Sequence, residues 1–462
     1  MDRAHTAALS SILGDDARVL TQPQLVEQLS RDFYWYSPVL RKQLDGKTAD
    51  LVAQPTTVTQ IQGVLRYCHA HDLPVTVRGA GTGNYGQAVP LRGGVVLDLA
   101  LMDRIETIQP DGVAVCQPGA RLGVVESEAR KTGWELRCYP STIVKASIGG
   151  FLGGGSGGIG SVAHGNLRDF QTVRAIEVVT MEAEPRVVKH EGEAVHDILH
   201  AWGTNGVITR IWLALTPAVE WSQCAVAFAT FDSAYDFSER IANGVCWVKR
   251  LVTTFEWPIP SFFTPVRQYA PEEKALVFFM IASRQLTELE GAARQAGGEV
   301  SYRGAYAGLG TRPLLSDYTW NHTTLWAISA DEAYTYLQCG FDPKTVREQL
   351  SLLRERFGHE ILFHMEFMKN GDGQVIPGAI PLVYFTSEER LNEMIGFCRE
   401  IGVFVANPHV NNVEGGGRYR ADNAQLLAKK RYDPKGLMNP GKMITFETDA
   451  RADATVTGAG TK

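Results

Sequence analysis

Two glycine-rich stretches have the residue types that could hold a phosphate-bearing, flat ligand. The first, Gly79-Ala80-Gly81-Thr82-Gly83, follows the β-type run Val75–Arg78. Without side chains, consecutive backbone N–H groups can turn toward one concavity, which suits phosphate. The second, Ile148–Gly160, interleaves glycines with Ile148, Phe151, Leu152 and Ile159, whereas a flexible linker would be polar. It predicts a buried loop pressed against a flat ligand.

The first stretch also matches a dinucleotide fingerprint. Gly81-x-Gly83-x-x-Gly86 has the required spacing, and Asp98 lies where a ribose-binding acid would sit in a Rossmann unit. That fingerprint needs a helix after its last glycine, but Pro90 and a Gly-Gly turn follow and lead to the β-type run Val95–Leu99. The phosphate-binding loop of a different α+β fold is therefore favoured over an NAD-dependent Rossmann dehydrogenase.

Candidate acid–base residues lie in the C-terminal half. In the predicted strand Phe363–Met368, alternation places His364 and Glu366 on one face, which is either a proton-handling face or the solvated side of a sheet. The polar loop Asn407–Asn412 contains His409 and Asn411. We expect these two residues to contact substrate, the alternative being a turn that hydrogen-bonds its own backbone.

An aromatic stretch is the candidate substrate wall. Alternation along Tyr318–Trp326 places Tyr318, Trp320, His322 and Thr324 on one face. Such a wall suits an aromatic or phenolic substrate, although aromatic stripes also build cores. We assign Trp320 and His322 to substrate binding.

Histidine spacing gives no convincing metal site. His196 and His200 are four residues apart, which suits a metal on a helix, but no third ligand is evident. His359 and His364 are five apart and do not fit His-Glu-x-x-His. We therefore expect no metal.

Composition sets the frame for these residues. The 462-residue chain is 44% hydrophobic and 21% charged, with a net charge of −6 and no basic stripe, so we expect two domains and no nucleic-acid partner. Its seven cysteines are scattered, which favours a reducing cytoplasm. The N-terminus lacks a signal-peptide core, and the apolar run Ala275–Ala282 is far shorter than the roughly 20 residues that span a bilayer.

The segments around the glycine stretches are predicted to form both helices and strands. A helix begins near Thr57 and has apolar residues at helical spacing, and a second helix is predicted over Leu122–Thr132. From Glu220 onward, predicted strands and helices alternate, with few glycine clusters before Gly371. The chain therefore reads as an α+β protein with a separate second domain.

Four stretches together resemble a known family: Leu51–Leu65 with Arg78–Thr82, Pro140–Gly160, Gly203–Thr209 and Asp433–Lys442. They resemble the FAD-linked oxidoreductases of the vanillyl-alcohol oxidase and p-cresol methylhydroxylase (PCMH-type, FAD-binding type 4) superfamily. Residues 50–105 are most similar to its glycolate and D-lactate dehydrogenase branch. The resemblance implies an FAD-binding domain from residues 1–217 and 402–447, an inserted α+β cap at 218–401, and a disordered tail at 448–462.

The resemblance also implies the cofactor contacts. The first glycine loop would hold the pyrophosphate, the second would run beside the isoalloxazine, and the C-terminal signature would approach the ring. The residues so implied are Arg78, Gly79, Ala80, Gly81, Thr82, Gly83, Ser141, Thr142, Ile148, Gly149, Gly150, Gly153, Val207, Ile208, Asn439 and Lys442.

Two departures from the family pattern refine the expected function. Thr82 stands where relatives carry an FAD-linking histidine, and no cysteine lies between Cys138 and Gly153, so we expect non-covalent FAD. The segment Lys369–Gln374 lacks the histidines with which relatives bind a divalent metal, which argues against a hydroxy-acid substrate. We expect hydride transfer from a CH–OH or benzylic carbon to FAD, with oxygen or another acceptor taking the electrons. A 2-hydroxy-acid dehydrogenase and a non-catalytic flavin-binding partner are the alternatives, and a homodimer is left open.

Overall fold

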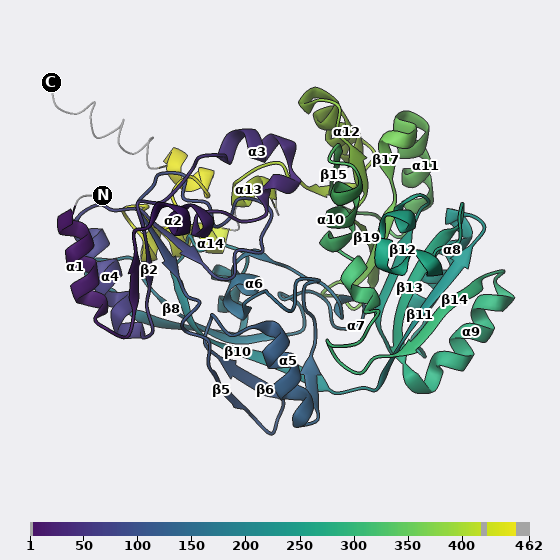
Figure 1. Cartoon of the computed structure of the whole chain (residues 1–462), viewed down its shortest axis with the longest axis horizontal. Coiled ribbons are helices and arrows are strands. Elements are labelled where there is room, and N and C mark those ends of the chain that lie inside the picture. The colour runs from purple at the N-terminus through teal and green to yellow at the C-terminus, as the bar shows by residue number, and fades with distance from the viewer. Residues whose placement is uncertain (1–2, 417–422, 450–462) are drawn as a thin grey trace.

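The computed structural model describes residues 3–416 and 423–449 (Figure 1). The chain forms two lobes, which we define as the first lobe (residues 3–217, 407–416 and 423–449) and the second lobe (residues 218–406). In Figure 1 the yellow C-terminal helix α14 lies among the purple N-terminal elements of the first lobe. The C-terminal part therefore returns to the N-terminal lobe. The expected disordered tail lies, apart from 448–449, outside the described residues.

The first lobe contains two sheets of the described chain. A four-stranded sheet has the order β1-β2-β4-β3, in which β2, β4 and β3 are parallel, and a six-stranded antiparallel sheet has the order β5-β6-β10-β8-β9 with β7 paired to β10. The strands are β1 Arg18–Leu20, β2 Leu51–Gln54, β3 Val75–Arg78, β4 Val95–Asp98, β5 Ile105–Ile108, β6 Val113–Cys116, β7 Trp134–Leu136, β8 Val173–Val179, β9 Val187–Glu191 and β10 Val207–Pro217. The helices are α1 Arg3–Leu13, α2 Pro23–Leu29, α3 Pro38–Leu44, α4 Val58–Ala70, α5 Leu122–Lys131, α6 Ile148–Gly154, α7 Ser161–His164, α13 Val413–Gly416 and α14 Asn423–Tyr432.

Local sequence explains the unit that leads into the first glycine loop. Thr57 and Gln60 form a capping box at the start of α4, which satisfies backbone N–H groups that a helix start leaves unpaired. The apolar face of α4 is buried beside β2 and β3. After Gly86 no helix occurs before β4, and Asp98 is buried at 2% exposure, bonded by Gln54. The NAD-type Rossmann alternative is therefore wrong.

The second lobe is built on an eight-stranded sheet of the described residues, with the order β14-β11-β13-β12-β18-β19-β16-β21 and a three-stranded sheet β15-β20-β17 beside it. Its strands are β11 Trp221–Phe228, β12 Lys249–Phe255, β13 Ala275–Ala282, β14 Glu299–Ala305, β15 Tyr334–Tyr336, β16 Gln338–Gly340, β17 Ile361–Leu362, β18 His364–Lys369, β19 Val375–Ala379, β20 Leu382–Tyr384 and β21 Phe404–Ala406. Its helices are α8 Phe231–Asn243, α9 Leu286–Gln295, α10 Asn321–Ala330, α11 Val346–Phe357 and α12 Glu388–Glu400. Because β21 pairs with β16, this sheet extends beyond the expected boundary at residue 401.

Two local expectations differ from the structure. The stretch Ile148–Gly160 begins as the helix α6, not as a loop, because Ser147 caps it by accepting the Gly150 N–H. The stretch Tyr318–Trp326 is not extended: a 3₁₀ helix, Leu315–Tyr318, is followed by α10. The prediction that Tyr318, Trp320, His322 and Thr324 share one face of a strand is therefore wrong, because the residues after Trp320 are helical and their side chains do not alternate between two faces.

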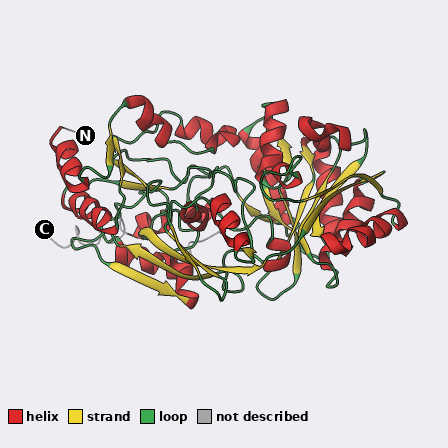
Figure 2. Cartoon of the chain, turned by 60° about the horizontal axis from the view of Figure 1, so that its bottom comes forward, coloured by secondary structure: helices red, strands yellow, loops and turns green. Residues whose placement is uncertain are grey.

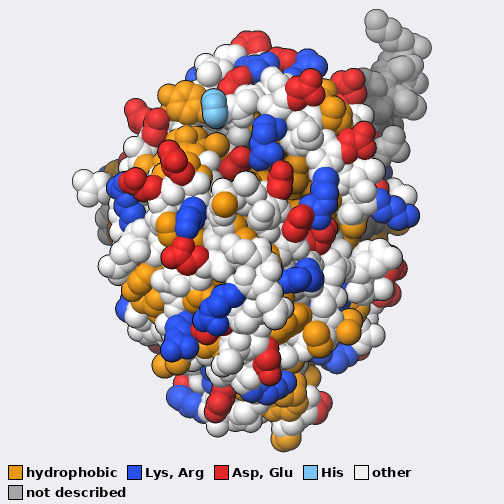
Figure 3. Space-filling view, turned by 90° about the vertical axis from the view of Figure 1, so that its right-hand side faces the viewer, with side chains coloured by type: hydrophobic (Ala, Val, Ile, Leu, Met, Phe, Trp, Pro, Cys, Tyr) orange, Lys and Arg blue, Asp and Glu red, His pale blue; other side chains and the backbone are white. Residues whose placement is uncertain are grey.

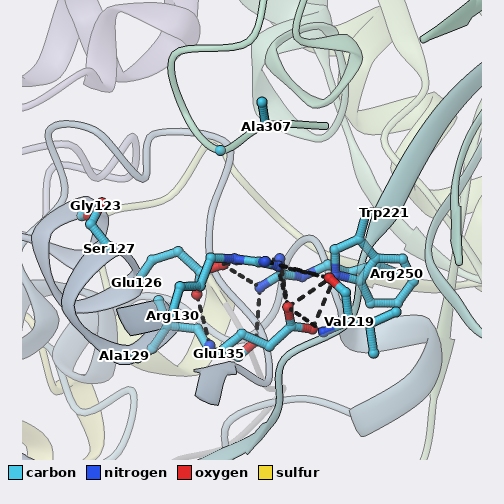
Figure 4. Close-up of polar contacts among 12 residues, drawn as sticks. Gly123, Glu126, Ser127, Ala129, Arg130, Glu135, Val219, Trp221, Arg250 and Ala307 are labelled. Carbon is cyan, nitrogen blue, oxygen red and sulfur yellow. Dashed lines mark hydrogen bonds and ion pairs between the residues drawn. The ribbon is translucent and has the colours of Figure 1, made fainter. Parts of the chain in front are cut away.

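A buried ion-pair network joins the lobes (Figure 4). Arg250 of β12 donates to Glu126 of α5 at 3.0 Å and lies 3.6 Å from Glu135 of β7, and all three side chains are 2% exposed. Arg130 pairs with both glutamates from the other side, and the Trp221 indole N–H donates to Glu135 at 3.0 Å. The charges of the two arginines and the two glutamates thus balance at the junction between the lobes.

Loops fill much of the space between the sheets of the two lobes (Figure 2). The outer face of the second lobe carries acidic and basic side chains interspersed with hydrophobic ones (Figure 3). Among the described residues, no helix combines the length and apolar character needed to cross a membrane.

Candidate active site

A cavity of about 990 Å³ lies between the lobes. Both glycine stretches of the first lobe line it, and so do residues of β16, β18, β19 and the start of α10 of the second lobe. This volume is at the upper end of the roughly 300–1,000 Å³ typical of ligand sites, so the cavity can hold a large ligand.

The structure brings most of the expected cofactor residues to this cavity. Those that line it are Gly79, Ala80, Gly81, Thr82, Gly83, Ser141, Thr142, Gly149, Gly150, Gly153 and Ile208. The remaining five, Arg78, Ile148, Val207, Asn439 and Lys442, are buried behind its wall. They support the wall and do not form it.

The glycines allow the two stretches to pack against each other. A Cβ on Gly79 would lie 2.4 Å from Ser147 Oγ and 3.0 Å from Gly150 Cα, and one on Gly149 would lie 2.9 Å from the Pro118 carbonyl oxygen. By contrast, nothing lies within 4 Å of a Cβ built on Gly153, which faces the cavity. The stretches therefore leave a smooth opening that fits a planar ring and backbone-bound phosphate.

Buried polar side chains brace the segment after the first glycine loop. Asp32 accepts from the Ala88 N–H at 3.2 Å, Lys442 Nζ donates to the Gly86 carbonyl at 2.7 Å, and Asn439 donates to the Gln87 carbonyl at 2.8 Å. Burial raises the pKa of Asp32 to about 6 and lowers the pKa of Lys442 to about 7, and the opposite charge of each opposes the other's shift. These residues fix the segment's position.

On the second-lobe side, Glu366 lines the cavity and His364 lies behind it. His364 Nε2 is 3.0 Å from Glu366 Oε1, which also accepts from the Trp320 N–H at 2.9 Å, while Thr253 Oγ1 donates to Oε2 at 2.6 Å. His364 and Glu366 are 0% and 1% exposed, so they do not form a solvated sheet face. The alternation predicted for this strand is confirmed: both side chains are on one face.

The start of α10 contributes Trp320, Asn321 and His322 to the cavity wall. The Trp320 indole nitrogen and the Asn321 carboxamide oxygen are buried and have no hydrogen-bond partner among the described residues. His322 lies with Nδ1 3.2 Å from the Asp317 carbonyl oxygen, and burial lowers its pKa.

His409 and Asn411 do not line the cavity. His409 is 4% exposed, with Nδ1 2.7 Å from Ser37 Oγ and Nε2 2.9 Å from the Tyr336 carbonyl oxygen. Burial lowers its pKa to about 4, against the opposing effect of the Tyr336 carbonyl. Because both ring nitrogens of His409 have partners, one in each lobe, His409 links the lobes and has no ring nitrogen available to a substrate.

Other cavity residues escaped the sequence analysis. Asp32, Gln87 and Asn321 all line the cavity, and the Gln87 side chain donates to the Gly154 carbonyl at 2.9 Å. The one feature of the sequence that could have indicated Asp32 is that it is an acidic residue beside an aromatic run. Nothing in the sequence pointed to Gln87 or Asn321. Among residues 3–416 and 423–449, no group of three or more His, Cys, Asp or Glu side chains could hold a metal ion.

The chain is similar to several known proteins. Residues 49–189 match the family model FAD_binding_4, described as FAD binding domain. A D-lactate dehydrogenase of Archaeoglobus fulgidus is 23% identical over 427 residues, which cover 85% of this chain and 91% of that protein. Glycolate oxidase subunit GlcD of Bacillus subtilis is 23% identical over 442 residues (87% and 90%), and that of Escherichia coli is 31% identical over 206 residues (42% and 40%).

Among solved structures, an alkyldihydroxyacetonephosphate synthase superposes with a TM-score of 0.73 at 14% identity, covering 96% of this chain and 86% of that one. At this identity the likeness shows a shared fold.

Proposed function

Given that the chain belongs to the FAD-linked oxidoreductases of the vanillyl-alcohol oxidase and p-cresol methylhydroxylase superfamily, we propose that the cavity between the lobes is its active site, where a CH–OH donor is oxidised. The observation that carries this proposal is the composition of the cavity wall: glycine stretches lie on one side, and Glu366, backed by the buried His364, lies on the other.

The residues present fit FAD. The backbone of Gly79–Gly83 with Ser141 and Thr142 would hold the pyrophosphate, and the opening at Gly149–Gly153 would admit the ring. FAD bound there would supply the hydride acceptor. Thr82 lines the cavity and carries neither the imidazole nor the thiol that would form a covalent bond to the flavin ring, which supports non-covalent binding.

We assign to Glu366 the role of receiving the hydroxyl proton. Its carboxylate has about four lone-pair positions, of which three accept from His364, Trp320 and Thr253. The remaining position is available to a substrate hydroxyl in the cavity. Since a hydride leaves an alkoxide more readily than an alcohol, holding that proton assists oxidation. His364 orients the carboxylate.

A 2-hydroxy acid is the second candidate donor. It is favoured by the D-lactate dehydrogenase and glycolate oxidase names of relatives that cover 85%, 87% and 42% of the chain.

The test begins with purified protein reconstituted with FAD. The protein should be yellow, release intact FAD on acid precipitation and bleach anaerobically with at least one alcohol or hydroxy acid; readmitted air then reports whether oxygen is an acceptor. If the protein binds no FAD, the proposed cofactor is wrong. If the denatured chain retains FAD, the proposal of non-covalent binding is wrong. If FAD is bound but no donor bleaches it, the proposed catalytic function is wrong.

A further inference from the structure

The helix α6 forms part of the cavity wall, although its sequence does not favour a helix. Four of the seven residues of Ile148–Gly154 are glycines, and all four line the cavity. Glycine is among the least favourable residues in a helix, and so short a helix is marginal by itself. Contacts with other segments must therefore hold α6 in place.

The carboxyl end of α6 is held by hydrogen bonds from two distant segments. The last carbonyl groups of a helix have no partner within it. Here the carbonyls of residues 152–154 accept, in this order, from the backbone N–H of His200, the backbone N–H of Trp202 and the side chain of Gln87, at 2.9, 2.8 and 2.9 Å. The position of α6 thus depends on these donors.

Gln87 differs from the other two donors because it connects the two glycine stretches. It follows the first stretch in the chain and lines the cavity. Its amide group occupies the space beside Gly83, where a Cβ would collide with Oε1, and Nε2 lies 3.2 Å from the position of a Cβ on Gly154. The Asn439 amide fixes the backbone of Gln87 by donating to its carbonyl at 2.8 Å. The Gln87 amide therefore lies between the two stretches and contacts both.

The other amide atom of Gln87 indicates why an amide is present here. Gln87 Oε1 is buried and has no hydrogen-bond partner among the residues that the structure describes. An apolar side chain of similar length would avoid the free-energy cost of this unpaired oxygen. The N–H group that bonds to Gly154 is therefore the feature that distinguishes Gln87 from a side chain that only fills space.

We propose that Gln87 is a positioning residue that fixes the distance between the two glycine stretches, and thereby the place of the flavin ring relative to Glu366. This inference rests on the proposed function of the cavity. The backbone of Gly79–Gly83 would hold the pyrophosphate and residues 149–153 would border the ring, so the separation of the stretches determines where the ring lies. Gln87 acts through the Gly154 carbonyl.

Gln87→Met tests the proposal, because it removes the donor and keeps the length of the side chain. The FAD affinity, measured by flavin-fluorescence titration, should fall about threefold to tenfold, as the loss of one hydrogen bond predicts. The absorbance maximum of the bound oxidised flavin should shift, which is a readout without turnover. Anaerobic bleaching at saturating donor should slow about tenfold or more, because hydride transfer is sensitive to small displacements.

Gln62→Met is the matched control. The Gln62 side chain of α4 also donates to a backbone carbonyl, that of Pro185, at 2.8 Å, but Gln62 does not line the cavity. This variant should lower the urea midpoint of unfolding about as much as Gln87→Met does. Its FAD affinity, flavin spectrum and bleaching rate should equal those of the wild type.

Gln87→Glu separates the hydrogen bond from side-chain packing. A protonated carboxyl can donate to the Gly154 carbonyl as the amide does, whereas a carboxylate only accepts. The FAD affinity relative to wild type should therefore be low at pH 9 and return to within about twofold at pH 5.5, since burial raises the pKa of a carboxyl. Asp32, His200 and Lys442 also face this segment, and they are present in both proteins compared.

The outcomes separate this proposal from the proposed function. If Gln87→Met has the FAD affinity, spectrum and bleaching rate of the wild type, or if Gln62→Met changes them equally, the positioning role is wrong. If the relative FAD affinity of Gln87→Glu does not depend on pH, the bond to Gly154 is not the cause. If no donor bleaches wild-type protein, the proposed function fails, while FAD affinity and spectrum still test Gln87.

Discussion

His364 and Glu366 lie two residues apart on β18 and meet through Nε2 and Oε1 at 3.0 Å, in a site where neither residue is more than 1% exposed. The other imidazole nitrogen, Nδ1, has no partner within the described chain, and the ring stacks on Phe255 with centroids 4.9 Å apart. A carboxylate only accepts hydrogen bonds, so Nε2 is the donor when it bonds to the Glu366 carboxylate. The imidazole therefore fixes the carboxylate in place.

Glu366→Gln should slow anaerobic flavin reduction about 10²- to 10⁴-fold, because the amide cannot take the hydroxyl proton. FAD content should not change, since the first lobe supplies the cofactor wall. The measurement is stopped-flow bleaching with the donor that reduces the wild-type protein fastest. Glu388→Gln, an exposed position at the start of α12, is the control. Equal bleaching rates in Glu366→Gln and wild type would remove Glu366 from the chemistry.

Gly79→Ala should abolish most FAD binding. The new Cβ would lie 2.4 Å from Ser147 Oγ and 3.0 Å from Gly150 Cα, so the two glycine stretches must separate. A flavin-fluorescence titration measures the affinity, which should fall at least about tenfold. Gly291→Ala, inside α9 with nothing within 4 Å of its Cβ, is the matched control and should stabilise by up to about 1 kcal/mol. Normal FAD affinity in Gly79→Ala would mean that the stretches tolerate separation.

The features that could be predicted from the sequence are those that depend on residues close together in the chain. Glycine spacing and strand alternation are local, so the loop Gly79–Gly83 and the shared face of His364 and Glu366 were predictable. The places of Asp32 and His409 were not, because they depend on partners far along the chain: Ala88 for Asp32, and Ser37 with Tyr336 for His409. The left-handed turn at Trp320 was hidden for the same reason, since Glu366 holds it from β18.

His409→Gln should make the free energy of unfolding less dependent on pH at acidic pH. Burial lowers the pKa of His409 to about 4, below its ordinary 6.5, so the unfolded chain binds the proton first. The corresponding stability is present above pH 6.5 and is lost as the pH falls toward 4, by at most about 1.4 kcal/mol per pH unit. Urea unfolding at pH 8, 6.5 and 5 measures it. Since burial also lowers the pKa of His164 to about 4, the variant keeps a residual slope. Parallel profiles for variant and wild type would contradict this origin.

Arg250→Met should destabilise the junction between the lobes by about 3–5 kcal/mol. The change leaves Glu126 and Glu135, both 2% exposed, with Arg130 as the remaining cation of the network in Figure 4. The urea midpoint measures the loss. Arg66→Met removes an exposed pair with Glu184 and should cost at most about 1 kcal/mol, because solvent screens it. Adding Glu135→Gln to Arg250→Met removes one stranded charge, so the double variant should regain part of the loss. A double variant less stable than Arg250→Met would show that packing of the Arg250 side chain, not charge balance, holds the junction.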